Sequence, residues 1–223
     1  MNHPLVESRE PVTLIGGGTL DSVQMDRALG VAPRLVAADG GAARALALGH
    51  MPEAVIGDFD SLDAASRARL DPAGLHHIPE QDTTDFDKAL RSIRAPFVLA
   101  LGFVGSRLDH TLGAFNTLAR HPDRRCLLLG GDDICFLAPR ALDLALPVGT
   151  RVSLFPVGPV SGRSTGLLWP IDGIDFAPDS ITGTSNEVTS GAVSLRFGAR
   201  AMLVILPQEA LEPALAGLAS APD

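Results

Sequence analysis

The chain has 223 residues, and 46% of them are apolar, which favours a globular protein over a disordered one. Acidic residues outnumber basic ones by 26 to 18, so the formal net charge of −8 argues against a nucleic-acid-binding surface. No apolar run approaches the roughly 20 residues of a membrane span, and residues 1–7 lack the pattern of a secretory signal. Cys126 and Cys135 lie in apolar surroundings, as buried thiols of a reduced compartment do. We therefore expect a cytoplasmic protein with neither nucleic-acid nor membrane partners.

Residues 1–138 alternate short apolar runs with segments of helical pattern. The predicted strands are 12–15, 35–38, 54–56, 75–78, 97–101 and 126–129. The predicted helices are 21–29, 42–48, 64–70, 84–93 and 109–120. This alternation predicts an N-terminal α/β domain in which helices cover both faces of a parallel sheet.

Residues 139–223 have a different composition, rich in Pro, Gly, Ser and Thr. Strands are predicted at 151–155, 192–197 and 201–206, and a helix is predicted at 209–218. Short strands separated by turn residues indicate a small antiparallel β domain, either a sandwich or a partial barrel.

Two carboxylates, Asp58 and Asp60, directly follow the apolar run that ends at Ile56. Ligands bind at the carboxyl edge of a parallel sheet, and both acids would be delivered there. Because two acids held so close repel each other, a divalent cation that bridges to a phosphate would stabilise them. The alternative is a turn whose acids cap the next helix.

Four further turns lead to the same expected edge. Gly16-Gly17-Gly18 could let backbone N–H groups approach a phosphate, but a simple tight turn is the favoured interpretation. Asp39-Gly40-Gly41 follows the second strand and could contact a ligand or cap a helix. Neither a G-x-G-x-x-G sequence nor a P-loop is present.

The third of these turns, residues 81–88, enters a helix whose N-cap is Thr84 or Asp82. Asp82, Asp85 and Lys88 are three residues apart, which would place them near one helix face. Acids beside an ammonium group suit a metal ion that carries phosphates.

The turn at residues 102–110 follows the fifth predicted strand. Its glycines would admit a ligand, and Arg107 could hold a phosphate with two hydrogen bonds. Asp109 and His110 begin the next helix, and taken alone His110 is better explained as a helix-start residue than as a catalyst.

The ordered set of motifs resembles the thiamine pyrophosphokinase family. It comprises Asp39-Gly40-Gly41-Ala42, Gly57-Asp58-Phe59-Asp60-Ser61, Gln81-Asp82-x-Thr84-Asp85-x-x-Lys88, Arg107-x-Asp109-His110, Ser164-Thr165-Gly166-Leu167-Leu168-Trp169-Pro170 and Gly183-Thr184-Ser185-Asn186. The resemblance extends from about residue 12 to residue 206. The chain departs from the usual family pattern at Ala43, where an Asn is common, and at Phe103 and Ser106, where glycines are common.

The resemblance implies an α/β catalytic domain over residues 1–138 that binds nucleotide and metal. It implies a β-sandwich over residues 139–223 that contributes to thiamine binding and dimerisation. Such proteins form homodimers with active sites at the interface. They transfer the pyrophosphoryl group of ATP to the hydroxyl of thiamine, which yields thiamine diphosphate and AMP.

The resemblance also implies roles for individual residues. Asp58, Asp60 and Asp85 would hold Mg²⁺, and Asp109 would lie near thiamine and its reacting hydroxyl. The expected catalytic residues are Asp58, Asp60, Asp85, Lys88, Arg107 and Asp109. The expected substrate-binding residues are Asp39, Gly40, Gln81, Thr84, Lys88, Arg107 and His110, with Ser185 and Asn186 supplied by the partner subunit.

Two alternatives belong to other functional classes. A haloacid-dehalogenase-like phosphatase also has Asp-x-Asp after a strand, with the first acid as a covalent nucleophile, and residues 129–133 resemble its later acidic motif. In those enzymes the motif usually follows the first strand, whereas here it follows the third. A non-catalytic nucleotide sensor would bind ATP without turning over thiamine.

Overall fold

The computed structural model describes residues 4–105 and 107–222, so Ser106 lies outside the described residues. The chain divides into two compact units. The first comprises Met1–Thr117 and Cys126–Gly131, and the second comprises Leu118–Arg125 and Asp132–Asp223. Among the described residues, no helix combines the length and apolarity that crossing a membrane requires.

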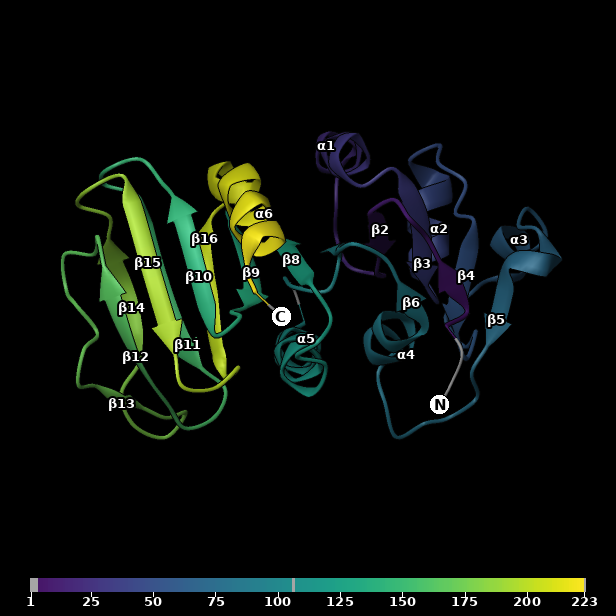
Figure 1. The fold of residues 1–223 in the computed structure, drawn as a ribbon. Coiled ribbons are helices and arrows are strands. Elements are labelled where there is room, and N and C mark those ends of the chain that lie inside the picture. The colour runs from purple at the N-terminus through teal and green to yellow at the C-terminus, as the bar shows by residue number, and fades with distance from the viewer. Residues whose placement is uncertain (1–3, 106, 223) are drawn as a thin grey trace. The chain divides into compact units, whose positions relative to one another are not determined.

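The first unit contains a parallel sheet with the strand order β8-β7-β2-β3-β4-β5 (Figure 1). Its strands are β2 (Val12–Ile15), β3 (Arg34–Ala38), β4 (Ala54–Gly57), β5 (Leu75–His77), β7 (Val98–Leu101) and β8 (Cys126–Gly130). A separate short parallel pair joins β1 (Val6–Glu7) to β6 (Ile93–Arg94). Nearly every residue of β2, β3, β4 and β7 is buried, as expected for strands covered on both faces.

The helices of this unit are α1 (Ser22–Val31), α2 (Gly41–Ala47), α3 (Ala64–Arg67), α4 (Asp85–Ser92) and α5 (Leu108–Arg120), with a 3-10 turn at Pro72–Gly74. Local side chains start several of them. Asp21 and Gln24 form a capping box at α1, and the hydroxyl of Thr84 accepts a hydrogen bond from the backbone N–H of Asp87 at α4. Because Thr84 is the N-cap, Asp82 precedes the helix, and the predicted helix face shared by Asp82, Asp85 and Lys88 is wrong.

The order of the sheet reverses at β2, which pairs with β3 on one side and β7 on the other. Ligands bind at such a switch point because the loops that follow the two strands diverge there. In this protein the loop after β2 and the loop after β7 still contact each other, because Gly18 N–H donates to the carbonyl of Gly102 at 3.0 Å. A Cβ at Gly16 would lie 2.7 Å from that carbonyl oxygen, and a Cβ at Gly18 would lie 2.6 Å from it. Only glycine therefore fits at these two positions.

The second unit consists of antiparallel sheets with the orders β10-β15-β12-β13 and β14-β11-β16-β9. Its strands are β9 (Asp133–Leu137), β10 (Ala141–Ala145), β11 (Arg151–Pro156), β12 (Val160–Thr165), β13 (Asp175–Phe176), β14 (Gly183–Glu187), β15 (Ala192–Phe197) and β16 (Met202–Pro207). Buried and exposed residues alternate along β10 and β15, so one face of their sheet packs inward. The predicted combination of a parallel α/β portion and an antiparallel β portion is confirmed.

The C-terminal helix α6 (Leu211–Ser220) follows the 3-10 turn Gln208–Ala210 and packs on β10. A Cβ at Gly217 would lie 2.6 Å from the carbonyl oxygen of Asp143, so the missing side chain allows this close contact. The sequence predicted this helix two residues too early and named only three of the strands in this unit.

We expect Gly41→Ala to destabilise the protein by about 2 to 3 kcal/mol, because overpacking of a tight contact carries that order of cost. The new Cβ would lie 2.1 Å from the carbonyl oxygen of Ile15. Gly30→Ala in α1 is the matched control, since nothing lies within 4 Å of its Cβ position. That change should stabilise the helix by about 0.5 to 1 kcal/mol. Urea denaturation of both variants measures the difference, and equal effects would contradict the prediction.

Candidate active site

A cleft of about 590 Å³ opens at the carboxyl edge of the parallel sheet in the first unit. Most of the residues predicted for this edge line it. These are Asp39, Gly40, Asp58, Asp60, Gln81, Thr84, Asp85, Lys88, Arg107 and His110. The four loops therefore surround one space, as the topology of a parallel sheet requires, and Gly16–Gly18 line it as well.

Asp39, Asp58 and Asp60 form an acidic cluster in the cleft. Their carboxylate oxygens lie within 4.8 Å of one another, close enough to share one metal ion. Asp39 is only 1% exposed, and its Oδ2 accepts a hydrogen bond from Ser61 N–H at 3.1 Å. Its Oδ1 is buried without a hydrogen-bond partner in the described part of the chain. A buried carboxylate oxygen with unused capacity, beside two further carboxylates, fits a hard divalent cation.

Burial raises the pKa of Asp39 to about 6, and the negative charges of Asp85 and Asp60 add to the shift. The backbone is also unusual here, because Asp39 has a φ of 41° and Phe59 a φ of 65°. Positive φ values are costly for residues other than glycine, and such strain concentrates at functional sites.

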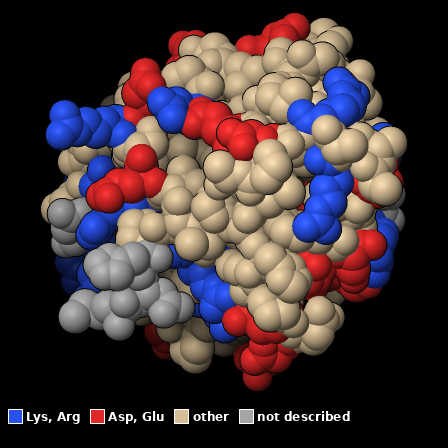
Figure 2. Space-filling view, turned by 90° about the vertical axis from the view of Figure 1, so that its right-hand side faces the viewer, with Lys and Arg blue, Asp and Glu red and all other residues tan. Residues whose placement is uncertain are grey.

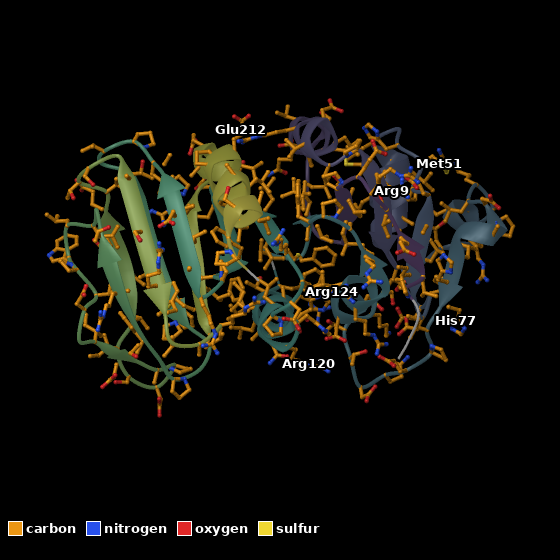
Figure 3. The ribbon with its side chains drawn as sticks, viewed as in Figure 1. Arg9, Met51, His77, Arg120, Arg124 and Glu212 are labelled. Carbon is orange, nitrogen blue, oxygen red and sulfur yellow. The ribbon has the colours of Figure 1, made fainter. Side chains whose placement is uncertain are left out.

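The ring of Phe59 anchors the turn between Asp58 and Asp60. It stacks on His77, whose side chain is labelled in Figure 3, with 5.4 Å between the ring centroids. The guanidinium carbon of Arg67 lies 5.4 Å from the centroid of the same ring. Within the turn, Asp60 N–H donates to Asp58 Oδ1 at 3.3 Å. These contacts hold the strained residue in place and fix the two carboxylates that flank it.

Lys88 is the buried cation of the cleft, with a side chain only 2% exposed. Its ammonium group donates to Asp58 Oδ2 at 2.7 Å and to Asp85 Oδ1 at 3.1 Å, while Gln81 donates to Asp58 Oδ2 at 3.0 Å. Burial alone would lower the pKa of Lys88, but the hydrogen bonds with the two carboxylates outweigh it and raise that pKa.

The two carboxylate partners of Lys88 respond in opposite ways. The hydrogen bond from Lys88 lowers the pKa of Asp58, whereas burial raises the pKa of Asp85. Asp85, the third Mg²⁺ ligand that the resemblance implies, is thus engaged with Lys88. Asp39 takes the third place in the group of carboxylates that lie close together.

Arg107 and Asp109 form a bidentate pair at the start of α5. The Nη2 and Nε groups of Arg107 donate to Asp109 at 2.6 and 3.2 Å. The hydrogen bond from Arg107 is the main cause that lowers the pKa of Asp109 to about 2, so this carboxylate is a weak proton acceptor near neutral pH. Arg107 lines the cleft, but Asp109 is not among the residues that line it.

Ser185 and Asn186 lie on β14 in the second unit and do not line the cleft of the first. Asn186 is 6% exposed, and its side chain holds a neighbouring loop. Its Nδ2 donates to the carbonyl of Trp169 at 2.7 Å, and its Oδ1 accepts from Trp169 N–H at 3.1 Å. Ser185 is exposed and has a φ of 61°, a third strained residue at a predicted position. The sequence did not indicate the loop-holding contacts of Asn186.

Further residues line the cleft that the sequence analysis did not name as site residues. They are Ala38, Ser61, Thr83, Phe86, Phe103, Val104 and Ala114, whereas Asp82 does not line it. Ser61 lies within the Asp-x-Asp-Ser motif, and this motif could have identified it as a site residue. Phe103 was noted only as a departure from a usual glycine. Phe86 follows Asp85 in the helical pattern, and its apolar spacing indicated only a core position.

On the face drawn in Figure 2, Lys and Arg side chains are interspersed with Asp and Glu and form no continuous basic surface. The charges that matter for a ligand are instead gathered in the cleft, where carboxylates and two cations lie together. An α/β unit with an acidic, glycine-lined cleft at its switch point belongs to the ligand-binding class of doubly wound folds.

The family model described as "Thiamin pyrophosphokinase, catalytic domain" matches residues 25–128. Thiamine pyrophosphokinase 1 of Oryza sativa subsp. japonica and that of Arabidopsis thaliana are each 30% identical to the chain over 165 residues. Both alignments cover 66% of this chain and 62% of the plant protein, so the chain spans less than two thirds of the length of these relatives.

Solved structures agree on the fold. A thiamin pyrophosphokinase from Geobacillus thermodenitrificans is 24% identical with a TM-score of 0.70, covering 90% of this chain and 100% of that one. Yeast thiamin pyrophosphokinase is 15% identical with a TM-score of 0.73, covering 97% of this chain and 94% of that one. The family model and the plant relatives make the chain similar to thiamin pyrophosphokinases, and the solved structures show that it has the fold of these proteins.

We expect Asp39→Asn to stabilise the metal-free protein at pH 7.5 by about 1 to 3 kcal/mol, because one pKa unit corresponds to about 1.4 kcal/mol. The pKa of Asp39 is raised from 3.8 to about 6 in the folded state, so the native protein binds this proton more tightly than the unfolded chain. The stability that this proton contributes is present below pH 3.8 and is lost as the pH rises through about 6.

The gain in Asp39→Asn should therefore shrink as the pH falls from 7.5 towards 4. Urea denaturation in the presence of a chelator at several pH values measures it. The control is Asp175→Asn, which changes an exposed carboxylate on β13. A gain that did not vary with pH would contradict the assigned cause.

Proposed function

We propose that the protein is a thiamine pyrophosphokinase. It transfers the β,γ-pyrophosphoryl group of ATP to the hydroxyl of thiamine, with Mg²⁺, and releases thiamine diphosphate and AMP. The observation that supports this proposal most is the cleft in which Asp39, Asp58 and Asp60 lie together beside the buried Lys88. The plant relatives that carry the name thiamine pyrophosphokinase add independent support.

The reaction needs little covalent chemistry from the protein. The hydroxyl oxygen of thiamine forms a bond to the β-phosphorus, and the bond from that phosphorus to the oxygen it shares with the α-phosphate breaks. AMP departs with that oxygen, and the hydroxyl proton passes to a base. Catalysis of such a transfer depends on positioning and on neutralising charge at the phosphate oxygens.

The residues of the cleft suit these tasks. Asp58, Asp60 and Asp85 are the proposed Mg²⁺ ligands, with Asp39 beside them. When bound, Mg²⁺ would neutralise charge on the phosphate oxygens. Lys88 supplies a fixed positive charge next to Asp58. Arg107 lines the cleft and could bind a phosphate through the N–H groups that do not donate to Asp109.

The acceptor is a cation, so the acidic cleft also favours its binding. We place Asp109 near the thiamine hydroxyl, where its low pKa suits orienting the hydroxyl and Arg107 more than accepting a proton. Ser185 and Asn186 are proposed to hold thiamine from the second unit of a partner subunit. In the described chain the side chain of Asn186 is bound to Trp169, so Asn186 would act by presenting that loop.

The phosphatase alternative is less well supported. In that reading the acidic residues at 132 and 133 would join Asp58 at the metal, but neither lines the cleft. Asp133 instead forms an ion pair with Arg151. A nucleotide sensor would use the same cleft, and turnover alone separates it from the kinase.

Incubation of the protein with ATP, Mg²⁺ and thiamine should release AMP in amounts equal to the thiamine diphosphate formed. Quantifying both nucleotides by chromatography tests this. Release of ADP would reject pyrophosphoryl transfer, phosphate release from simple esters would favour the phosphatase, and ATP binding without turnover would favour the sensor.

Asp58→Asn and Asp60→Asn test the acidic cluster, because each removes one of its negative charges, and Asp175→Asn is the matched control. Each should lower the rate at saturating ATP by at least about 100-fold, the usual cost of removing one group that stabilises the transition state. Asp175→Asn should retain the wild-type rate. Unchanged turnover in both cleft variants would remove these residues from the site.

We also propose a homodimer in which each cleft is completed by the partner. Large apolar side chains are exposed on both units, which is typical of surfaces that bind other proteins. On α5 these are Leu108, 71% exposed, and Leu112, 59% exposed. In the second unit they are Leu168, Trp169 and Ile181, which are 48%, 58% and 52% exposed.

We expect Leu112→Glu to convert the dimer into a monomer, because it would bury a charge in the proposed interface. Sedimentation velocity at a few protein concentrations measures the mass. Val148→Glu is the control, since Val148 is 67% exposed and lies outside the apolar set described above. A wild-type protein that sedimented as a monomer at working concentration would rule out the interface.

A further inference from the structure

The cleft has two halves of different chemistry. The loops after β3, β4 and β5 supply the carboxylates, Gln81 and Lys88, which suit a metal ion and phosphates. The loops after β2 and β7 supply glycines and apolar side chains, among them Phe103 and Val104, with Ala114 nearby on α5. Metal and phosphate binding does not account for this apolar half.

Phe103 is the largest side chain of the apolar half, and its neighbours hold it in place. Its ring centroid lies 4.3 Å from that of Phe86 at an interplanar angle of 35°. Phe86 is 3% exposed, so it is itself fixed by the core. The ring also lies close to the backbone of Gly16, where a Cβ would come within 2.7 Å of its Cε1 atom.

This arrangement prepares Phe103 for a ligand. The ring is held by its contacts with a second ring and a backbone segment, so little side-chain freedom remains to be lost when a planar group binds. Offset stacking on an aromatic ring is a general mode of nucleobase binding, and it tolerates different bases because each one has a π-face.

Charge favours the nucleobase over the acceptor ring as the occupant. The carboxylates lie in the other half of the cleft and attract the cationic thiazolium of thiamine. The apolar half is flanked by Arg107 and His110, and a neutral base suits this environment better than a cation does.

We propose that Phe103 is a nucleotide-binding residue whose ring forms the stacking wall for the nucleobase of ATP. This inference rests on the proposed function only for the identity of the nucleotide. Purines offer a larger stacking surface than pyrimidines, so ATP and GTP bind better than CTP and UTP.

Titration calorimetry in the presence of Mg²⁺ measures the binding affinity of two probes, a non-hydrolysable ATP analogue and inorganic tripolyphosphate. The variants compared with wild type are Phe103→Ala and Phe103→Leu. Phe103→Ala should weaken binding of the ATP analogue about tenfold, because loss of one base stack is worth that order of affinity. Phe103→Leu keeps apolar volume beside Phe86 and should weaken it about threefold. Tripolyphosphate has no base, so its Kd should stay within twofold of wild type.

Phe97→Ala is the matched control, since Phe97 is half-buried and precedes the amino end of β7 at the opposite edge of the sheet. It should leave both affinities unchanged. Thermal unfolding of each variant shows whether it is folded. If Phe103→Ala is unfolded, the binding measurements on Phe103→Leu decide the test.

Equal weakening of tripolyphosphate binding would overturn the proposal, as would unchanged binding of the ATP analogue. A rise in the Kd of thiamine without a rise in that of the analogue would assign the ring to the acceptor and also overturn it. These measurements need no turnover. A protein that binds the analogue through Phe103 but forms no AMP from ATP and thiamine would therefore refute the proposed function and leave this inference standing.

Discussion

The buried ammonium group of Lys88 is the interaction on which the arrangement of the cleft depends. A lone charge in an apolar interior is unstable, so Lys88 requires carboxylates close by. Asp58 comes from the loop after β4, and Asp85 comes from the first turn of α4. Because one cation binds both, it ties two separate segments of chain together at a fixed distance. Removing either carboxylate would leave Lys88 under-compensated and would loosen the edge of the sheet where the ligands are expected.

The cleft also keeps features that reduce stability. Asp39 is buried with one oxygen unsatisfied, and both Asp39 and Phe59 adopt backbone conformations that are costly outside glycine. The stacked contacts of Phe59 with His77 and Arg67 compensate part of this cost. Such a balance is expected where a protein holds like charges together, and the proposed binding of Mg²⁺ would relieve their repulsion.

Much of the first unit could be predicted from the sequence, since most of its strands are continuous apolar runs and several of its helices begin at recognisable caps. Thr84 shows the limit of that approach: either Thr84 or Asp82 could cap α4, and only the hydrogen bond from Asp87 decides between them. The second unit was harder, because strands such as β12 and β14 are rich in Gly, Ser and Thr and expose alternate residues. The gathering of acids at one edge followed from topology, whereas the position of Phe103 against Phe86 depends on packing between distant segments.

The loop that Asn186 holds contains Trp169, the single tryptophan of a chain that has no tyrosine. Indole emission shifts with the polarity of its surroundings, and here every photon from an excited indole originates at one exposed position. The protein thus carries a built-in optical reporter on the second unit. The emission maximum of Trp169 and its quenching by solutes will reveal, without any label, whether that loop faces water or another surface.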